Sequence, residues 1–442
     1  MTDVGDSLEL DIGAVAHGGH CVARHEGRVV FVRHTLPGER VTATVTGIGG
    51  GGRHLTADAV AIHEAAPGRR TPACPWSGPG LCGGCDFQHV EPVTQRELKA
   101  AVVAEQLQRL AGIERQVVVE AVDGDHDGLG WRTRSRFVAD ARGHLGLRSF
   151  HSHDVVAVQD CPISHPDMDV PDLTSRTWAS RSELDVVVDG SGTRLLLGAR
   201  PARRGGHPTR TRPGHDVPAL VHRAGGRGWR VTGAGFWQVH PGAADALVDA
   251  VLEGLEPRPG ESALDLFAGV GLFAGVLAAA VGPEGRVTAV ESDRAAVTDA
   301  RVNLRDLPGT RVVPARVDAS LGEHLPASPD GGAPRVDLVV LDPPRTGARA
   351  PVVHAITALA PRRVAYVACD PAALARDLAT FAADGYALVR LRAFDLFPMT
   401  HHVEAVATLE RTGPDRTSRL DQAGDQPGDQ TGTQHGTQPE VS

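Results

Sequence analysis

The chain has 442 residues, of which 41% are hydrophobic, and a formal net charge of −9 at pH 7. This length predicts about two to four domains, each with enough apolar residues for a core. No apolar run approaches the roughly 18 residues of a membrane helix, and the acidic N-terminus lacks the order of a signal peptide. We therefore expect a cytoplasmic protein without membrane contact.

Residues 1–63 alternate short apolar runs with glycine turns, which predicts a small OB-like β-barrel. Strands are expected at residues 8–12, 29–32, 40–46 and 56–62. The Leu-Pro-Gly-Glu sequence of Leu36–Glu39 marks a turn between two of them. Together with Gly18, Gly19 and the run Gly27–Val32, this pattern resembles the TRAM domain, a barrel that binds RNA.

Residues 64–235 are expected to form a β-rich central domain that includes a helix over residues 94–111, where apolar residues recur at helical spacing. Its arginines are concentrated, since Arg194–Arg230 contains nine arginines and one acid, Asp216. Such local positive charge favours contact with RNA phosphates, although a solvated arginine-rich surface shows the same pattern. The alternating cations of Trp131–Arg136 are the leading candidate for contact with RNA.

Four of the six cysteines form a metal-ligand pattern. Two residues separate Cys82 from Cys85, seven separate Cys74 from Cys82, and Cys161 lies further along the chain. In a cytosolic protein such cysteines bind metal or react more often than they form disulfides. Four thiolates suit zinc or a [4Fe–4S] cluster, and spacing alone neither chooses between them nor excludes a site without metal. Cys21 is expected to be a free cysteine of the barrel.

From residue 236 to residue 410, apolar strands alternate with helical stretches, which predicts a doubly wound α/β sheet. Its strands are expected at residues 262–267, 286–290, 311–314, 336–341, 363–368, 386–391 and 403–409. Residues 411–442 have almost no apolar content and are expected to form a disordered tail.

The first of these strands runs into a glycine loop, Ala263–Phe273, that leads into a helix. Gly269 and Gly271 permit a tight turn and a close approach of the backbone to a ligand, while Ala274 replaces the third glycine of the dinucleotide fingerprint. Glu291 ends the next strand, where an acid can bind ribose hydroxyls. A dinucleotide site or a tight turn without ligand would show the same loop.

Two later strand ends carry residues suited to chemistry. Asp342 opens the sequence Asp-Pro-Pro-Arg after an apolar strand, and this resembles the fourth motif of class I S-adenosylmethionine methyltransferases. Cys369 ends another apolar run and is followed by Asp-Pro, and Glu404 ends the segment Phe397–Glu404. Taken alone, Cys369 would be a small buried residue and Glu404 a surface acid.

Together, the cysteine segment, the sequence Phe-Pro-Met-Thr-His-His-Val-Glu, Asp-Pro-Pro-Arg, the glycine loop and the upstream cysteines resemble the RNA uracil-C5 methyltransferases of the TrmA and RumA type, over residues 8–410. The resemblance implies a methyltransferase domain over residues 236–410, with Cys369 as nucleophile and Glu404 as general base. It assigns the S-adenosylmethionine pocket to Gln238, Phe267, Gly269, Gly271, Glu291 (ribose), Asp318 (adenine) and Asp342 (methyl donor). It assigns a [4Fe–4S] cluster to Cys74, Cys82, Cys85 and Cys161.

Several positions depart from the family pattern. These are Ala368 and Asp370 beside the nucleophile, where Ser and Asn are frequent, Ala373 in place of Thr, His240 in place of Asn, and Leu272 in place of a polar contact. The gap between the first two cluster cysteines is also longer than usual.

The reaction needs these residue types because uracil C5 is too weak a nucleophile to take a methyl group unaided. A thiolate that adds to C6 makes C5 enolate-like, and a base must then remove the C5 proton. We therefore expect a depressed pKa for Cys369. Within a base-paired RNA helix, C6 of a uracil is hidden from a nucleophile. The target uridine is therefore expected in single-stranded RNA or flipped out of its stack.

The sequence thus predicts a monomeric enzyme that forms 5-methyluridine in RNA rather than DNA, with 23S ribosomal RNA favoured over transfer RNA. The alternative is a non-catalytic iron–sulfur protein that binds RNA, against which the intact Cys369 and Glu404 count. A cytosine-C5 methyltransferase would carry a Pro-Cys nucleophile, which the sequence lacks. The barrel and the arginine-rich stretches disfavour a small-molecule substrate.

Overall fold

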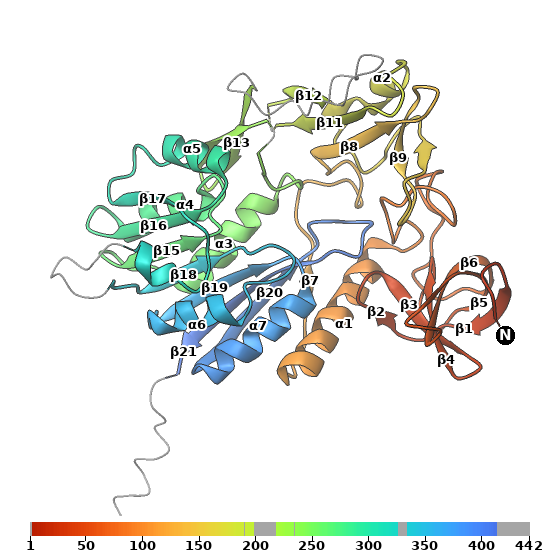
Figure 1. Ribbon diagram of the computed structural model, residues 1–442, viewed down its shortest axis with the longest axis horizontal. Coiled ribbons are helices and arrows are strands. Elements are labelled where there is room, and N and C mark those ends of the chain that lie inside the picture. The colour runs from red at the N-terminus through yellow and green to blue at the C-terminus, as the bar shows by residue number, and fades with distance from the viewer. Residues whose placement is uncertain (1, 190, 199–217, 234, 326–333, 413–442) are drawn as a thin grey trace, which may run out of the picture.

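The computed structural model describes residues 2–189, 191–198, 218–233, 235–325 and 334–412. These residues form a barrel, a small sheet and a large α/β sheet, coloured red, yellow and green to blue in Figure 1. The tail predicted at residues 411–442 lies outside the described residues from residue 413 on. Within the described ranges, no helix is long and apolar enough to cross a membrane.

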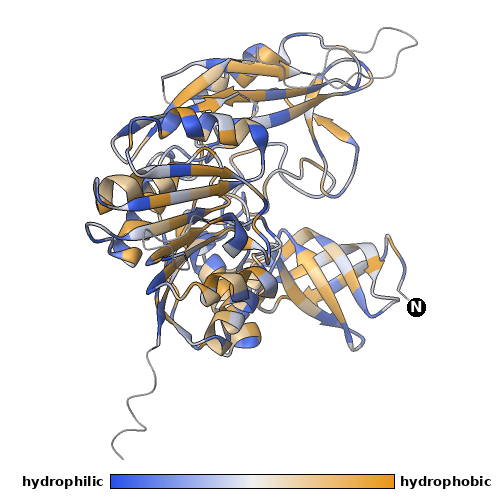
Figure 2. Ribbon diagram, turned by 60° about the vertical axis from the view of Figure 1, so that its left-hand side comes forward, coloured by the Kyte–Doolittle hydropathy of each residue, from blue (hydrophilic) through white to orange (hydrophobic). Residues whose placement is uncertain are grey.

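The barrel is a six-stranded sheet in the order β1-β5-β6-β4-β3-β2. Its strands are Ser7–Asp11 (β1), Val15–Ala16 (β2), His20–His25 (β3), Arg28–Arg33 (β4), Arg40–Gly49 (β5) and His54–Glu64 (β6). Buried residues alternate with more exposed ones along much of β5, because successive side chains point to opposite faces, and Figure 2 shows hydrophobic and hydrophilic residues interspersed along the barrel strands. The four predicted strands are confirmed, and Cys21 on β3 is buried and free, as expected.

The segment after the barrel joins the large sheet. Helix α1 (Pro92–Ala111) packs along α7 (Pro371–Ala383), and strand β7 (Val119–Glu120) pairs in parallel with β20 (Tyr386–Phe394). Apolar residues of both α1 and β7 belong to the core of the large sheet. Part of the region that the sequence assigns to the central domain therefore completes the large α/β unit.

The small sheet has the strand order β10-β9-β8-β11-β12. Its elements are Arg134–Ala139 (β8), Leu145–Arg148 (β9), Val155–Ala157 (β10), Glu183–Val188 (β11) and Arg194–Gly198 (β12), with the short helices Pro166–Met168 (η1) and Val170–Thr174 (α2). Five of the nine arginines between residues 194 and 230 lie outside the described residues.

The segment predicted to contact RNA, Trp131–Arg136, is engaged within the protein. Trp131 is buried, and Arg136 forms two hydrogen bonds with Asp185, of 2.7 and 3.0 Å. RNA contact by this segment stays a prediction.

The large sheet has eight strands in the order β17-β16-β15-β18-β19-β21-β20-β7. The strands from β17 to β19 run parallel, and β21 lies antiparallel between β19 and β20. The strands not yet given are Ser262–Leu266 (β15), Arg286–Glu291 (β16), Thr310–Pro314 (β17), Leu338–Leu341 (β18), Arg363–Ala368 (β19) and Glu404–Arg411 (β21). They match the predicted strands to within a few residues, which confirms the doubly wound α/β fold.

Helices cover both faces of this sheet. Helices α1, α6 (Ala350–Ala358) and α7 share one hydrophobic core, and α3 (Ala243–Leu255) and α4 (Leu272–Val281) share the core on the other face. The remaining elements are Ala219–Ala224 (β13), Arg227–Thr232 (β14), Arg294–Asn303 (α5) and Leu321–His324 (η2).

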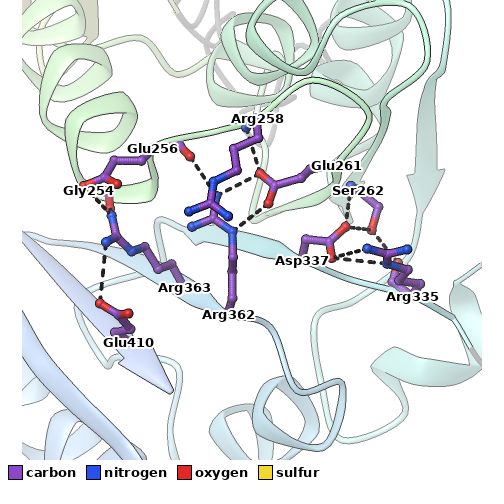
Figure 3. A network of polar contacts seen from close by, with 10 residues as sticks. All are labelled: Gly254, Glu256, Arg258, Glu261, Ser262, Arg335, Asp337, Arg362, Arg363 and Glu410. Carbon is purple, nitrogen blue, oxygen red and sulfur yellow. Dashed lines mark hydrogen bonds and ion pairs between the residues drawn. The ribbon is translucent and has the colours of Figure 1, made fainter. Parts of the chain in front are cut away.

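A polar network ties together the amino ends of the parallel strands (Figure 3). Just before β19, Arg362 donates two hydrogen bonds to Glu261, of 2.6 and 2.8 Å. Asp337, just before β18, accepts a hydrogen bond of 2.9 Å from the N–H of Ser262 on β15. This edge is thereby closed by the protein itself, and the opposite, carboxyl edge is where such a sheet binds ligands.

Candidate active site

The carboxyl edge of the large sheet collects most of the residues that the sequence singles out. The glycine loop follows β15, Glu291 ends β16, Asp342 follows β18 and Cys369 follows β19. Glu404 begins β21, and because β21 is antiparallel to β19, its start lies at the edge where β19 ends. Residues far apart in the sequence therefore share one side of the sheet.

The glycine loop has the backbone conformation that its sequence predicts. Gly269 and Gly271 have φ angles of 54° and 89°, and Phe267 also has a positive φ of 61°. A Cβ atom on Gly269 would meet no described atom within 4 Å, so this side of the loop is open. The N–H of Gly269 donates a hydrogen bond of 2.9 Å to Glu291, which ties the loop to the end of β16.

Acidic side chains cluster behind this loop. Burial raises the pKa of Asp265 to about 8; a hydrogen bond from the N–H of Ala274 opposes the increase, and the charges of Asp342 and Glu291 add to it. Burial also raises the pKa of Asp342 to about 7. One oxygen of Asp265 is buried with no hydrogen-bond partner in the described ranges. Such a cluster favours a cationic ligand. Sequence reasoning missed Asp265, although an acid inside an apolar strand was a visible signal.

Cys369 and Glu404 flank the last residue pair of two neighbouring strands. Ala368 of β19 pairs with Ala405 of β21, Cys369 directly follows Ala368, and Glu404 directly precedes Ala405, so the two side chains are close enough for the charge of Glu404 to act on the thiol. Glu404 is only 4% exposed. Burial, and then the charge of Asp342, raise its pKa well above the ordinary value of a glutamate.

The expectation of a depressed pKa for Cys369 is wrong for the protein without ligands. Burial, followed by the charges of Glu404 and Asp342, raises the pKa of the thiol to about 12, while Arg345 lowers it. The sequence could not show that the pKa of Cys369 is raised, because Glu404 and Asp342 lie at the ends of other strands. Cys369 is therefore a thiol here, and its proton must leave before it can act as a nucleophile.

A cavity of about 150 Å³ lies over Cys369. Its walls come from the barrel segment Val15–Gly19, from α1 with Lys99, and from the strand-end loops with Arg345 and His402. Nε2 of His402 lies 3.3 Å from the guanidinium of Arg345. Burial lowers the pKa of His402 to about 3, so its ring is neutral and can accept a hydrogen bond from Arg345. Sequence reasoning assigned no role to Arg345 or to the barrel in this site.

Two predicted cofactor residues, Asp318 and Gln238, do not line the cavity over Cys369. Asp318 follows β17 at the same edge and is exposed, and the hydroxyl and N–H of Ser320 donate to it at 2.6 and 2.9 Å and lower its pKa. Gln238 lines a separate small pocket with Arg134 and His222. None of the other predicted cofactor residues lines that pocket, so the role of Gln238 stays a prediction.

The four predicted metal ligands come together. Cys74, Cys82, Cys85 and Cys161 line one cavity of about 110 Å³. Burial raises the pKa of the first three thiols, that of Cys82 to about 11. In the part of the chain that the structure describes, no three His, Cys, Asp or Glu side chains are grouped so that they could hold a metal ion.

A doubly wound sheet with a glycine loop after β15, an acid at the end of β16 and an Asp-Pro-Pro sequence after β18 defines a class I S-adenosylmethionine-dependent methyltransferase. Family models match residues 2–48 as a TRAM domain and residues 333–412 as a tRNA (Uracil-5-)-methyltransferase. Residues 242–329, which include the glycine loop, match the model of Protein-L-isoaspartate(D-aspartate) O-methyltransferase.

Full-length relatives narrow this class. An uncharacterized RNA methyltransferase of Streptomyces avermitilis is 47% identical over 434 residues, which covers 92% of this chain and 99% of that protein. The 23S rRNA (uracil(1939)-C(5))-methyltransferase RlmD of Pseudomonas fluorescens is 34% identical over 439 residues, which covers 92% of this chain and 95% of that protein. The chain belongs to the family of RNA uracil-C5 methyltransferases.

A solved structure supports the fold. The Pyrococcus abyssi tRNA (uracil-54, C5)-methyltransferase in complex with S-adenosyl-L-homocysteine matches with a TM-score of 0.63 and 20% identity. The match covers 90% of this chain and 99% of that chain, so barrel, small sheet and large sheet belong to one shared architecture.

Proposed function

We propose that this RNA uracil-C5 methyltransferase forms 5-methyluridine in 23S ribosomal RNA, with Cys369 as nucleophile and Glu404 as general base. The observation that supports the mechanism is the register of β19 and β21, in which Ala368, the residue before Cys369, pairs with Ala405, the residue after Glu404, while Cys369 itself lines the cavity. Similarity over nearly the whole chain to RlmD proteins, which are named for uracil 1939 of 23S rRNA, favours ribosomal over transfer RNA.

S-adenosylmethionine supplies an electrophilic methyl group next to a positive sulfur. The open side of Gly269 and the positive φ angles of the loop suit a close approach of this ligand. Asp265 and Asp342 suit a cation, because a positive ligand lowers their raised pKa values and favours their charged forms. In this proposal Glu291 binds the ribose, Asp318 lies near the adenine, and Phe267, Gly271 and Gln238 complete the pocket.

The thiol of Cys369 loses its proton to solvent, the resulting thiolate forms a bond to C6 of the uracil, and the electron pair of the C5=C6 bond moves toward C5 and the O4 carbonyl. Arg345 favours the anionic form of both Cys369 and Glu404, since its charge lowers both pKa values. After C5 has gained the methyl group, Glu404 removes the C5 proton, the double bond forms again and Cys369 leaves as a thiolate.

We further propose a [4Fe–4S] cluster on the four cysteines. Zinc–sulfur bonds of about 2.3 Å would require the four sulfur atoms to converge on one point. In a four-iron cluster each thiolate binds a different iron, so the thiolates lie further apart around a larger space. The shared cavity of about 110 Å³ offers such a space between the four thiols. Its role is structural, and the cysteine loop is also held by a hydrogen bond of 3.0 Å from Gly83 to Arg148.

The function is tested by mass-spectrometric mapping of 5-methyluridine in ribosomal and transfer RNA from cells with and without the gene. We expect one 5-methyluridine of 23S rRNA to disappear, and to return with the wild-type gene but not with Cys369→Ala. Unchanged 5-methyluridine in both RNA pools would refute the function. Loss confined to transfer RNA would overturn the choice of substrate, and restoration by Cys369→Ala would favour the non-catalytic alternative.

A further inference from the structure

One wall of the cavity over Cys369 belongs to the N-terminal barrel. The segment Val15–Gly19 comprises β2 and the turn before β3, and all of its residues line the cavity together with Cys369. Phe87, Leu98 and Val102 continue the apolar part of the same wall. The cavity is therefore shared between two folding units.

His17 connects this segment to the residue that follows the nucleophile. Its Nε2 lies 3.3 Å from the carboxylate of Asp370. Asp370 in turn caps helix α7, because its carboxylate accepts a hydrogen bond of 2.7 Å from the N–H of Ala373. A barrel side chain thus acts on the strand-to-helix turn that positions Cys369.

Gly19 makes a second contact, with the segment that precedes Glu404. A Cβ atom on Gly19 would lie 2.6 Å from the Cβ of His401, closer than two carbon atoms can approach. Only glycine therefore allows the barrel backbone to pack this closely against His401.

The size of the cavity suits one nucleobase. A volume of about 150 Å³ equals that of roughly five water molecules at about 30 Å³ each, which is the scale of a single six-membered base. A base that is flipped out of its stack needs such an enclosing pocket to bring C6 to the nucleophile.

We propose that the barrel segment Val15–Gly19 is part of the active site, where it encloses the flipped-out target pyrimidine over Cys369. His17 is a positioning residue that acts through Asp370. This inference rests on the proposed function and deepens it, because it gives the RNA-binding barrel a role in the reacting step. If the barrel only bound flanking phosphates, mutations in it would change RNA affinity. If it forms a wall of the pocket, mutations in it change the rate of methyl transfer in the enzyme–RNA complex.

The first test compares Gly19→Ala with Gly27→Ala. Both glycines lie in barrel turns with a φ of 79°, so alanine costs the same backbone strain at each. A Cβ at Gly27 meets no described atom within 4 Å, whereas at Gly19 it meets His401. We expect Gly19→Ala to lower the single-turnover rate of methyl transfer to a 23S rRNA transcript about ten-fold or more, while Gly27→Ala keeps the wild-type rate. The dissociation constant of the RNA should change less than about three-fold in both variants.

The second test uses His17→Ala, which removes a partly exposed side chain and leaves the barrel core intact. We expect kcat to fall about ten-fold with KM for RNA nearly unchanged, and His17→Gln, which keeps a hydrogen-bond donor, to recover part of the loss. If Gly19→Ala melts at a lower temperature than Gly27→Ala, a loss of rate in Gly19→Ala could come from lost stability. The His17 variants then decide whether the barrel segment affects methyl transfer.

The outcomes separate the inference from the function on which it rests. Wild-type rates in Gly19→Ala and His17→Ala would overturn the inference and leave the function standing. Weakened RNA binding with an unchanged single-turnover rate would also overturn the inference. It would indicate that the barrel binds only RNA that flanks the target. If the wild-type protein transfers no methyl group to ribosomal or transfer RNA, the function fails and the inference fails with it.

Discussion

Asp86 holds His401 in place: its carboxylate accepts a hydrogen bond of 2.6 Å from Nδ1 of His401 and one of 3.1 Å from the backbone N–H of the same residue. Asp86 directly follows Cys85, and His401 lies three residues before Glu404. The N–H groups of Asp86 and of the next residue also donate to the C=O of Met399, both at 2.9 Å. The cysteine loop thus supports the segment that carries the proposed general base.

Replacing Asp86 by Asn should loosen this support. Burial alone would raise the pKa of Asp86, but hydrogen bonds and charge from His401 hold it below its ordinary value, so at pH 7 the pair is a charge-assisted hydrogen bond. We expect Asp86→Asn to lower the free energy of unfolding by about 1–3 kcal/mol and to reduce methyl transfer. The contribution of Asp86 should be present above about pH 4 and fade below it. Denaturant unfolding measures the free energy of unfolding, and Asp11→Asn, at an exposed position, is the control. Equal stability of the two variants would contradict a stabilising role of Asp86.

The roles of Cys369 and Glu404 predict opposite behaviour of covalent complexes. Glu404→Gln should trap an RNA–protein adduct, because the methylated intermediate cannot lose its C5 proton, and should lower turnover by about 10²–10⁴-fold. Cys369→Ala should form no adduct. Denaturing gels with labelled RNA measure both, and Glu410→Gln, near the other end of β21, should behave as wild type. An adduct in Cys369→Ala would refute the nucleophile.

Arg345 should control how easily Cys369 ionises. The pKa of the thiol is already raised to about 12, and Arg345 lowers it, so Arg345→Ala should raise it further and leave less thiolate at any given pH. Because less thiolate is then present, adduct formation at pH 7 should be slower than in the wild-type protein. Arg345→Lys keeps the charge and should reduce the rate of adduct formation less than Arg345→Ala. Arg335→Ala, at the opposite edge of the sheet, is the control and should keep the wild-type rate. A pH profile of adduct formation that does not move would contradict this role.

Binding of S-adenosylmethionine should release protons. Without ligand, Asp342 and Asp265 have pKa values of about 7 and about 8. A bound cation lowers these values, so affinity should increase as the pH rises to about 8 and then level off. S-adenosylhomocysteine lacks the sulfonium charge and should depend less on pH. Calorimetry in buffers of different ionisation enthalpy counts the protons, and affinity for S-adenosylmethionine that is independent of pH would contradict the acidic cluster as its site.

The cluster can be tested with a matched pair of cysteines. Cys85→Ala should lose the iron, the sulfide and the brown colour of anaerobically purified protein, because Cys85 lines the cavity of the four cysteines. Cys21→Ala removes a buried cysteine of the barrel and should keep them all. Iron and sulfide analysis with absorption spectra measures both. Stoichiometric zinc in anaerobically purified wild-type protein would overturn the cluster.

The strands of the large sheet could be predicted because each is a short apolar run between turn signals, as at Arg363–Ala368. Strand β7 could not be predicted, since Val119–Glu120 has only two residues and becomes a strand by pairing with β20. A helix was predicted over residues 94–111 and is observed at Pro92–Ala111, but its packing against α7 depends on a partner more than two hundred positions away. Local pattern carries no information on such a partner.

The sequence by itself determined the family and predicted the chemistry and most of the candidate site, because each motif is local: a strand and the few residues that follow it, as at Gly269, Asp342 and Cys369. Only the tertiary structure decided how these motifs act on one another. The antiparallel return of β21 brings Glu404 close to Cys369, and burial among carboxylates raises the pKa of the thiol instead of lowering it. The packing of the barrel puts His17 beside Asp370. Register, burial and distances between charges are properties of segments in contact, and contacts between distant segments form only when the whole chain folds.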